Sequence, residues 1–360
     1  MLQNHDTDFT QLTRNIKQWG KELGFQEVRI SDCDLTEDVK HLERWIERGF
    51  HGSMSYMANN IDKRAKPENL HPGTIRIISV RLDYIPQGDR SKSLITKPKK
   101  AFVARYALGR DYHKVIKAKL KKLAEKINLQ VDQHQYRAFV DSAPILERAI
   151  AAKAGLGWIG KNTMLINRQA GSYFFLGELF TNIPLPVDNK TTSHCGSCSA
   201  CISICPTKAI VAPYQLDARK CISYLTIESK TSIPTSLRPL MGNRIFGCDD
   251  CQLICPWNKF AKPTNEKDFK PRHNLDSADL IKLFLWSEEE FLKNTEGSAI
   301  RRTGYNGWLR NIAVALGNAP RCQYTLSALR SRLSIGNDMV KEHIEWAIRQ
   351  QLKNKPSFSS

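Results

Sequence analysis

Apolar and polar positions alternate with helix and strand periods over the first half of the chain. The segment from Phe9 to Leu23 has the pattern of an amphipathic helix, and so has Lys114 to Lys126. Strands are predicted at Glu27 to Ile30, Ile75 to Val80, Lys100 to Arg105 and Tyr136 to Val140. This succession of helices and strands predicts an α/β domain over residues 1–185.

The rest of the chain has two different patterns. Residues 186–262 are rich in cysteine, and Ala261 to Asn274, rich in Lys, Pro and Asn, has the composition of a connector. Residues 275–354 show helical periods only, and Leu309 to Asn318 and Val340 to Leu352 resemble helices of HEAT-type repeats. The sequence thus predicts three domains: 1–185, 186–262 and 275–354.

Charge adds an expectation about the partner. The 360 residues carry a formal net charge of +18, and a field of that sign attracts polyanions such as nucleic acid. The alternative is that basic composition merely keeps the protein in solution. Six arginines in the helical part are candidates for phosphate contacts: Arg301, Arg302, Arg310, Arg321, Arg330 and Arg332.

The sequence shows neither the pattern of an export signal nor that of a membrane span. Residues 1–20 contain no apolar signal core, and no run of about eighteen apolar residues occurs. We therefore expect a cytoplasmic protein with no membrane span.

Eight of the ten cysteines fall in two runs. The first has two, two and three residues between its cysteines and then Pro206; this is the bacterial ferredoxin pattern, in which three thiolates hold one four-iron cluster and the fourth reaches a second. The second run has Ile245 where the pattern needs a cysteine, and Cys221 upstream can replace it. The crossover predicts Cys195, Cys198, Cys201 and Cys255 as ligands of cluster one, and Cys205, Cys221, Cys248 and Cys251 as ligands of cluster two.

Structural zinc and disulfides are the alternatives. Zinc needs four ligands and gives no reason for Cys205 or Cys255 at their spacing before proline. Disulfides do not suit a reduced cytosolic protein. The remaining Cys33 and Cys322 stand alone and are expected to be buried small side chains.

Three other motifs are weaker. Gly155, Gly157 and Gly160 fit the dinucleotide fingerprint by letter, but a helical run from Ile145 to Ala154 precedes them where a strand is needed, so Gly155 is predicted to end a helix and Gly157 to Lys161 to form a turn. Neither the three-cysteine motif of radical S-adenosylmethionine enzymes nor a histidine cobalamin fingerprint is present.

Asp141 has two open interpretations. It follows a predicted strand and precedes a helix start with Pro144 inside its first turn, so it can cap that helix. Strand ends are also where open α/β sheets bind ligands, so it can equally take part in chemistry.

Taken together, these segments resemble the epoxyqueuosine reductase family. The resemblance covers residues 10 to 350 and rests on Phe139 to Arg148, Gly155 to Asn162, the Gly177-Glu178 turn before Thr181, the spaced cysteines with Cys221 to Glu228, and Gly247 to Gln252.

The resemblance implies a fold, an activity and a set of cofactors. It implies an N-terminal α/β cobalamin-binding domain, a ferredoxin-like domain with two 4Fe-4S clusters and a HEAT-like α-helical domain that binds tRNA. The implied reaction reduces epoxyqueuosine to queuosine in the anticodon stem-loop of tRNA, with electrons from an external low-potential donor.

The resemblance also implies roles for particular residues. Asp141 would be the proton donor, with a pKa raised by burial beside the corrinoid. The implied cobalamin contacts are Arg64, Asp141, Leu165, Leu176, Ser223 and Asp249.

Two other functions stay open. A reductive dehalogenase of a small molecule would share the clusters and cobalamin but gives no role to the basic surface. A non-catalytic electron-transfer or RNA-binding iron-sulfur protein would bind no corrinoid.

The oligomeric state is a separate prediction: we expect a monomer.

Overall fold

A four-stranded antiparallel sheet forms the centre of the N-terminal part of the protein, in a computed structural model that describes residues 8–89 and 91–353. Its strands lie in the order β1 (Glu27–Ser31), β2 (Arg76–Asp83), β7 (Phe174–Thr181) and β4 (Tyr136–Phe139). All eight residues of β7 are buried, because helices cover both faces of the sheet. The rule that places ligands at the carboxyl edge of a parallel sheet therefore does not apply here.

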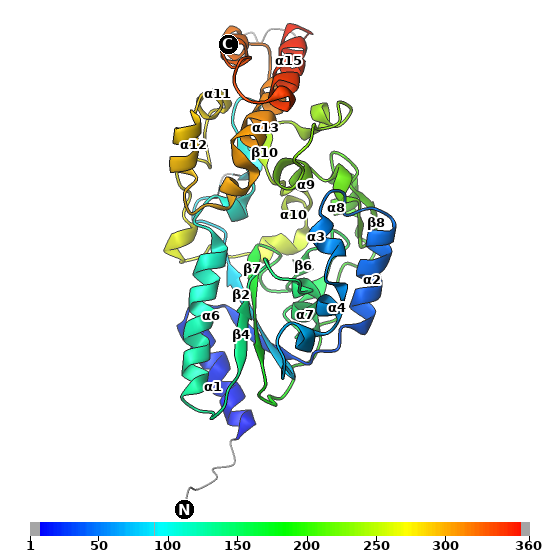
Figure 1. Cartoon of the computed structure of the whole chain (residues 1–360), viewed down its shortest axis with the longest axis vertical. Coiled ribbons are helices and arrows are strands. Elements are labelled where there is room, and N and C mark those ends of the chain that lie inside the picture. Colours follow the sequence, from blue (N-terminus) through cyan, green and yellow to red (C-terminus); the bar gives the residue numbers. More distant parts are fainter. Residues whose placement is uncertain (1–7, 90, 354–360) are drawn as a thin grey trace, which may run out of the picture.

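Helices pack on the two faces of this sheet (Figure 1). One face carries α1 (Phe9–Glu22) and α6 (Tyr112–Asn128), and a Cβ added at Gly177 of β7 would lie 2.6 Å from Ile116 of α6. The other face carries α7 (Glu147–Lys153), with α2 (Thr36–Glu47), α3 (Ser55–Ala58) and α4 (Ile61–Ala65) beyond it. The sequence predicted α1, α6 and most of α7, since their apolar faces fill the two layers, and it made no specific prediction for α2, α3 or α4.

Four local predictions need correction. The strand predicted at Lys100 to Arg105 shrinks to β3 (Phe102–Val103), which pairs in parallel with β10 (Arg244–Phe246) from the second half of the chain. Pro144 lies in a bend before α7 and not in its first turn. Gly177 and Glu178 lie inside β7 and form no turn, and the predicted turn after Gly157 contains strand β5 (Trp158–Ile159) paired with β6 (Leu165–Ile166).

The cysteine segment contains only short elements. They are α8 (Ala200–Ile204), β8 (Ile210–Ala212), β9 (Gln215–Leu216), a turn of 3-10 helix at Ala218–Lys220, α9 (Ile222–Ile227), a second 3-10 turn at Arg238–Met241, β10, α10 (Asp250–Leu253) and a third at Pro256–Phe260. No residue of α8 is buried, so an apolar core does not hold this helix in place.

Five helices close the chain. They are α11 (Leu280–Phe284), α12 (Glu288–Asn294), α13 (Gly304–Asn318), α14 (Gln323–Ser331) and α15 (Asp338–Lys353). Residues 307–317 of α13 are all buried, because α15, α11, α9 and β10 surround it. A Cβ at Gly317 would lie 2.5 Å from the Trp346 ring, so glycine allows α13 and α15 to approach closely. Both predicted terminal helices are confirmed, and so is the fold class of mixed α/β, cysteine-rich and helical parts.

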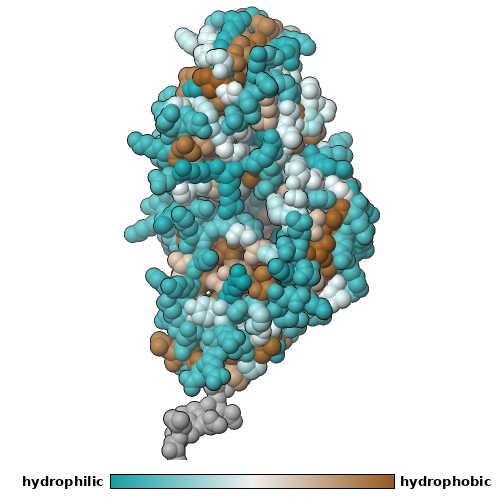
Figure 2. All heavy atoms as spheres, in the orientation of Figure 1, coloured by the Kyte–Doolittle hydropathy of each residue, from teal (hydrophilic) through white to brown (hydrophobic). Residues whose placement is uncertain are grey.

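The molecule is elongated, with the sheet at one end, the C-terminal helices at the other and the cysteine segment between them (Figure 1). Hydrophilic residues cover most of the face in Figure 2, and apolar atoms gather in small patches, some of them over the C-terminal helices. Within the described ranges, no helix combines the length and the apolar character that a membrane crossing needs.

Candidate active site and cysteine clusters

Asp141 lies two residues after the last residue of β4, in a left-handed backbone conformation with φ 56°. The helix that follows begins only at Glu147, so Asp141 is not its cap. Instead the Asp141 N–H donates to the Glu147 carboxylate at 3.0 Å. Such a conformation in a non-glycine residue costs about 1 to 3 kcal/mol and is typical of functional sites. Of the two interpretations of Asp141, the structure excludes helix capping.

Three side chains from distant parts of the chain converge on the Asp141 carboxylate. Tyr112 and His113 come from the start of α6: the Tyr112 hydroxyl donates to Oδ2 at 2.5 Å, and Nε2 of His113 lies 3.3 Å from the same oxygen. Arg302, just before α13, places Nη1 4.0 Å from Oδ2. The Asp141 side chain is nevertheless 52% exposed, so a ligand can reach it.

The expectation that burial raises the pKa of Asp141 is wrong for this structure. Burial does favour the protonated form, but the hydrogen bonds from His113 and Tyr112 outweigh it and lower the pKa of Asp141. For His113 the signs reverse: burial lowers the pKa, while hydrogen bonds to Asp111 and Asp141 raise it above its ordinary value, against the Arg302 charge. A proton shared by this pair therefore lies on the imidazole.

Two further carboxyls, those of Glu147 and Glu178, have raised pKa values and can hold a proton in this region. Burial and the charge of Asp141 raise the pKa of Glu147 to about 7. Glu178 of β7 is fully buried, accepts a hydrogen bond from the Ser79 hydroxyl at 2.5 Å and leaves Oε1 without a partner. Burial raises the pKa of Glu178 well above its ordinary value, and the charge of Glu147 adds to this. A glutamate within an otherwise apolar strand is the sequence signal that could have identified Glu178 as a candidate functional residue.

The six predicted cobalamin contacts fall into small groups. Leu165 and Leu176 are buried in one apolar cluster. Arg64 is 5% exposed, donates to the Tyr56 carbonyl at 2.9 Å and keeps its Nε without a partner. Burial, with Glu228 and then Asp141 adding their charges, raises the pKa of Tyr56 to about 12.

The remaining two predicted contacts lie near the cysteines. Ser223 is in the first turn of α9, two residues after Cys221. Asp249 precedes α10, between Cys248 and Cys251, and is 2% exposed. Burial raises the pKa of Asp249 to about 6, although Arg105 counteracts this.

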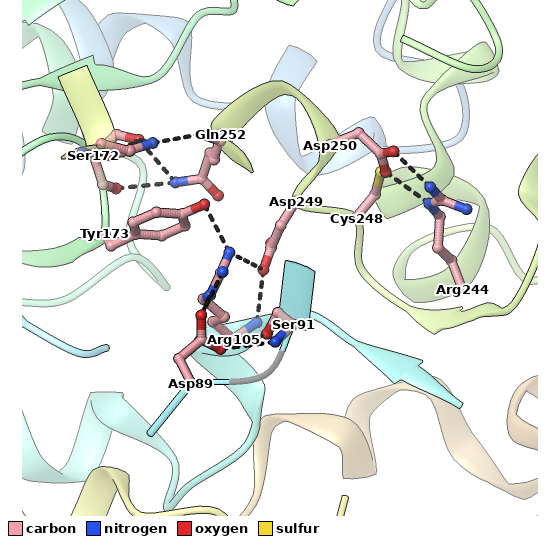
Figure 3. A network of polar contacts seen from close by, with 11 residues as sticks. Asp89, Ser91, Arg105, Ser172, Tyr173, Arg244, Cys248, Asp249, Asp250 and Gln252 are labelled. Atoms are coloured by element: carbon pink, nitrogen blue, oxygen red, sulfur yellow. Dashed lines mark hydrogen bonds and ion pairs between the residues drawn. The ribbon is translucent and has the colours of Figure 1, made fainter. Parts of the chain in front are cut away.

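A polar network fixes the loop that carries Cys248 and Cys251 (Figure 3). Arg105 donates its backbone N–H to Asp249 at 2.9 Å, its Nη1 to the Tyr173 hydroxyl at 2.7 Å and its Nε to Asp89 at 2.8 Å. On the other side of the loop, Arg244 donates to Asp250 at 2.6 Å, and the Cys248 thiol donates to the same carboxylate at 2.8 Å. Periodicity and motif spacing did not predict these roles, and the contacts of Arg105 with Asp249 and Tyr173 join parts of the chain that are far apart in sequence.

The structure brings four of the eight predicted ligand cysteines to one cavity. Cys195, Cys198, Cys201 and Cys255 line one cavity of about 1250 Å³. Burial, and then the charges of Cys221 and Cys205 among others, raise the pKa of Cys251, and the Cys248 thiol lies on the same loop. Within the described ranges, no three His, Cys, Asp or Glu side chains are close enough to share a single metal ion.

The glycine run supports the first cysteine set. Trp158 donates its indole N–H to the Cys195 sulfur at 3.4 Å, and Lys161 donates to the carbonyls of Gly196 and Cys198 at 2.6 and 2.8 Å. Gly155, with φ 86°, ends α7 as predicted. The run therefore braces a cysteine loop and does not have the strand and helix of a dinucleotide site.

One of the six candidate arginines is structural. Arg310 is fully buried and donates to the carbonyls of Leu225, Ser229 and Thr231. Its expected contact with phosphate is wrong. Arg332 is also tied to carbonyls, those of Leu285 and Trp286, whereas Arg321 and Arg330 are exposed.

A double set of cluster-type cysteines beside a pocket of acids, tyrosines and a histidine defines an iron-sulfur oxidoreductase. Family models match in two places: "Epoxyqueuosine reductase QueG, DUF1730" over residues 64–142 and "4Fe-4S double cluster binding domain" over residues 194–258. The epoxyqueuosine reductase of Pseudomonas aeruginosa is 60% identical over 95% of this chain and 95% of its own length. The chain belongs to the epoxyqueuosine reductase family.

Solved structures agree with this assignment. An epoxyqueuosine reductase crystallised with an epoxyqueuosine-modified tRNA-Tyr stem loop has a TM-score of 0.87 and 28% identity, over 95% of this chain and 90% of that one. The Bacillus subtilis enzyme, with a TM-score of 0.86, 28% identity and the same coverage, was crystallised with its aspartate-bearing catalytic loop swung out of the active site.

Proposed function

We propose that this chain reduces the epoxide of epoxyqueuosine in tRNA to the alkene of queuosine, with Asp141 as proton donor and electrons delivered through two 4Fe-4S clusters and cobalamin. The observation that carries the proposal is the convergence of Tyr112, His113 and Arg302 on Asp141, in a chain that also brings four cysteines to one cavity. The reaction consumes two electrons and two protons and releases one water.

The eight cysteines are the proposed cluster ligands. Cys195, Cys198, Cys201 and Cys255 would hold cluster one, and Cys205, Cys221, Cys248 and Cys251 cluster two. The spacing, the shared cavity of the first set and the mutual effect of Cys205, Cys221 and Cys251 support this assignment. Each cluster, when present, supplies single electrons at low potential.

Asp141 is the proposed final proton donor, and His113 is the group that reloads it. Because the pKa of Asp141 is lowered and that of His113 is raised, the imidazolium holds the proton at rest. Its Nε2 lies 3.3 Å from the Asp141 carboxylate, within reach for transfer. The catalytic loop of the Bacillus subtilis relative, named for an aspartate, agrees with this role for Asp141.

The residues predicted to contact cobalamin fit a corrinoid. An apolar wall from Leu165 and Leu176, a buried Arg64 Nε–H without an acceptor, and the carboxyl of Asp249 offer the mixture of apolar contact and hydrogen bonding that a ring with amide side chains needs. Ser223 and Asp141 would complete the contacts. Cobalamin, when bound, supplies a strongly reducing metal.

The proposed partner is tRNA, bound through its anticodon stem-loop. The net charge of +18 and the exposed Arg321 and Arg330 support a polyanionic substrate, and the stem loop in the solved relative supports this class of RNA. We propose that residues 1–185 carry the corrinoid and the acid, 186–262 the clusters, and 275–354 the RNA contacts. A monomer in the cytoplasm, where tRNA and reduced thiols occur together, completes the proposal.

One experiment tests the function. The protein, reconstituted without oxygen, is incubated with cobalamin, dithionite and epoxyqueuosine-containing tRNA, and the released nucleosides are analysed by mass. We expect a nucleoside lighter by one oxygen atom. A protein that binds corrinoid and dehalogenates a small aryl halide, yet leaves the tRNA unchanged, would contradict the proposal.

Salt dependence tests the RNA partner separately. Because phosphate contacts release counterions, the affinity for an anticodon stem-loop should fall steeply from 50 to 200 mM salt, by about tenfold or more. Binding that is indifferent to salt would remove the electrostatic basis of the partner assignment.

A further inference from the structure

The cavity beside the first cysteine set has a one-sided charge. Its lining includes four cationic side chains, Lys161, Arg168, Lys259 and Lys262, and no Asp or Glu. Arg168, Lys259 and Lys262 are exposed, while Lys161 is used to hold the Cys198 loop. The whole chain has two acidic residues for every three basic ones, so an acid-free lining is a local feature.

An aromatic path leads from this surface to the first cysteine. Phe260 is 41% exposed at the mouth, and its ring lies 5.9 Å from that of Trp257. The Trp257 ring lies 5.2 Å from Trp158, whose N–H bonds to the Cys195 sulfur. An apolar centre with a charged rim is the usual anatomy of a protein docking site.

The first cysteine set is also the one nearer to solvent. Cys198 is exposed, whereas all four cysteines of the second set are only half-buried. The second set shares its loop with Asp249 and is close to Ser223, on the side of the proposed corrinoid site. An electron from outside therefore enters at the first set.

We propose that Arg168, Lys259, Lys262 and Phe260 form an entry surface on which a small acidic one-electron carrier protein docks. The inference rests on the proposed function, because it names the source of its electrons. In each encounter the carrier centre is oxidised by one electron and cluster one is reduced by one, with no bond made or broken. Two encounters supply one turnover. Electron-transfer encounters of this kind are small, short-lived and steered by opposite charge.

The surface is distinct from the route that RNA needs. His113, at the start of α6, and Arg302 lie next to the Asp141 carboxylate, and neither they nor Asp141 line the cavity at the first cysteine set. The cations of the entry surface therefore have a function separate from that of the RNA-binding arginines.

A charge-reversal variant tests the inference. The probe is fully reduced flavodoxin, an acidic carrier whose semiquinone colour differs from that of clusters, mixed with the holoenzyme in a stopped-flow instrument. In the triple variant R168E/K259E/K262E, the second-order rate constant for semiquinone formation at low salt should fall by about tenfold or more, and its salt dependence should flatten. The matched control K21E/K117E/K122E, on exposed lysines of α1 and α6, changes charge equally and should stay within about twofold.

Two further measurements separate the causes. Reduction by dithionite alone should reach the same extent in all three proteins, which shows that the clusters are intact, and turnover driven by dithionite tests the proposed function without the carrier. Stem-loop affinity should be unchanged in R168E/K259E/K262E. An unaltered flavodoxin rate, an equal loss in the control, or a loss of RNA affinity in place of the carrier rate would overturn the proposal. If the triple variant fails to take up clusters, R168E/K262E, which leaves the residues next to Cys255 intact, decides with the same criteria.

Discussion

The pocket around Asp141 and the cysteine segment hold their functional groups by different means. Asp141, Tyr112 and His113 are placed by a sheet with two buried central strands and by α6, a helix of 17 residues. The cysteines are placed by helices of four to six residues and by polar contacts such as Arg244 with Asp250. The Asp141 site is thus placed by long elements of the apolar core, whereas the cysteine-bearing elements are short and combine polar contacts with core residues such as Ile222 and Leu225.

The protonation of the thiols adds an energetic difference between the cysteine segment and the Asp141 site. Burial raises the pKa of Cys201, Cys248, Cys251 and Cys255, and neighbouring charges add to the effect. Burial thus favours the protonated form of these four thiols in the iron-free protein, and metal binding must displace their protons. The Asp141 pocket, by contrast, has its hydrogen bonds already in place.

The largest expected effect is the loss of a predicted cluster ligand in the cysteine segment. Cys221→Ala removes the displaced ligand, so iron should fall from about eight toward about four atoms per chain and turnover should be lost. Iron analysis of the reconstituted protein measures this. The lone Cys322 supplies the control, because Cys322→Ala should keep the full iron content. Unchanged iron in Cys221→Ala would disprove its role as a ligand.

The second largest expected effect is the fall in turnover when the acid at Asp141 is removed. Asp141→Asn keeps the shape but removes the acid, so single-turnover rates should fall by about 10²- to 10⁴-fold while both clusters remain. Rapid-quench analysis of the nucleosides gives the rate, and the absorption spectrum reports the clusters. Asp132→Asn, at an exposed position, serves as the matched control. Near-normal turnover in Asp141→Asn would show that another group is the donor.

Different sequence signals predicted the elements around Asp141 and the cysteine segment. Periodicity located α1, α6, β1 and β4, because amphipathic elements carry their own burial pattern. Cysteine spacing grouped the proposed ligands without any prediction of structure, because ligand spacing is local. Contacts across the fold had no such signal: Arg302 is 161 residues from Asp141, and nothing in the sequence brings them together. The predicted rise in the pKa of Asp141 was wrong for the same reason, because the hydrogen bonds that lower this pKa come from a distant part of the chain.

A third prediction extends the comparison to the C-terminal helices. Arg310→Met leaves the carbonyls of Leu225, Ser229 and Thr231 without their donor, so the free energy of unfolding should fall by about 3 kcal/mol. Arg330→Ala, on the exposed side of α14, should change it by less than about 0.5 kcal/mol. Anaerobic thermal melts compare the two. Equal melting temperatures would contradict the structural role of Arg310.

The smallest expected effect is the pH dependence of the pocket. Since the pKa of His113 is raised, the imidazolium persists below that pKa and is lost as pH rises through it. Turnover should therefore be flat on the acid side and decline by up to about tenfold per pH unit on the alkaline side. The stabilisation from the charged His113 follows the same sign, present below the ordinary pKa and lost above the raised one. His113→Gln should abolish the alkaline limb, and a limb that persists would assign it to another group.

The central claim is that electrons come from the cysteine side and the proton from Asp141. The most direct test mixes enzyme whose clusters have been reduced beforehand, with cobalamin bound and free reductant removed, with one equivalent of epoxyqueuosine stem-loop, and follows the cluster spectrum and the nucleoside mass together. We predict that the wild-type clusters reoxidise as queuosine forms, and that Asp141→Asn keeps its clusters reduced and its epoxide intact. Reoxidation with queuosine formation at the wild-type rate in Asp141→Asn would contradict the account.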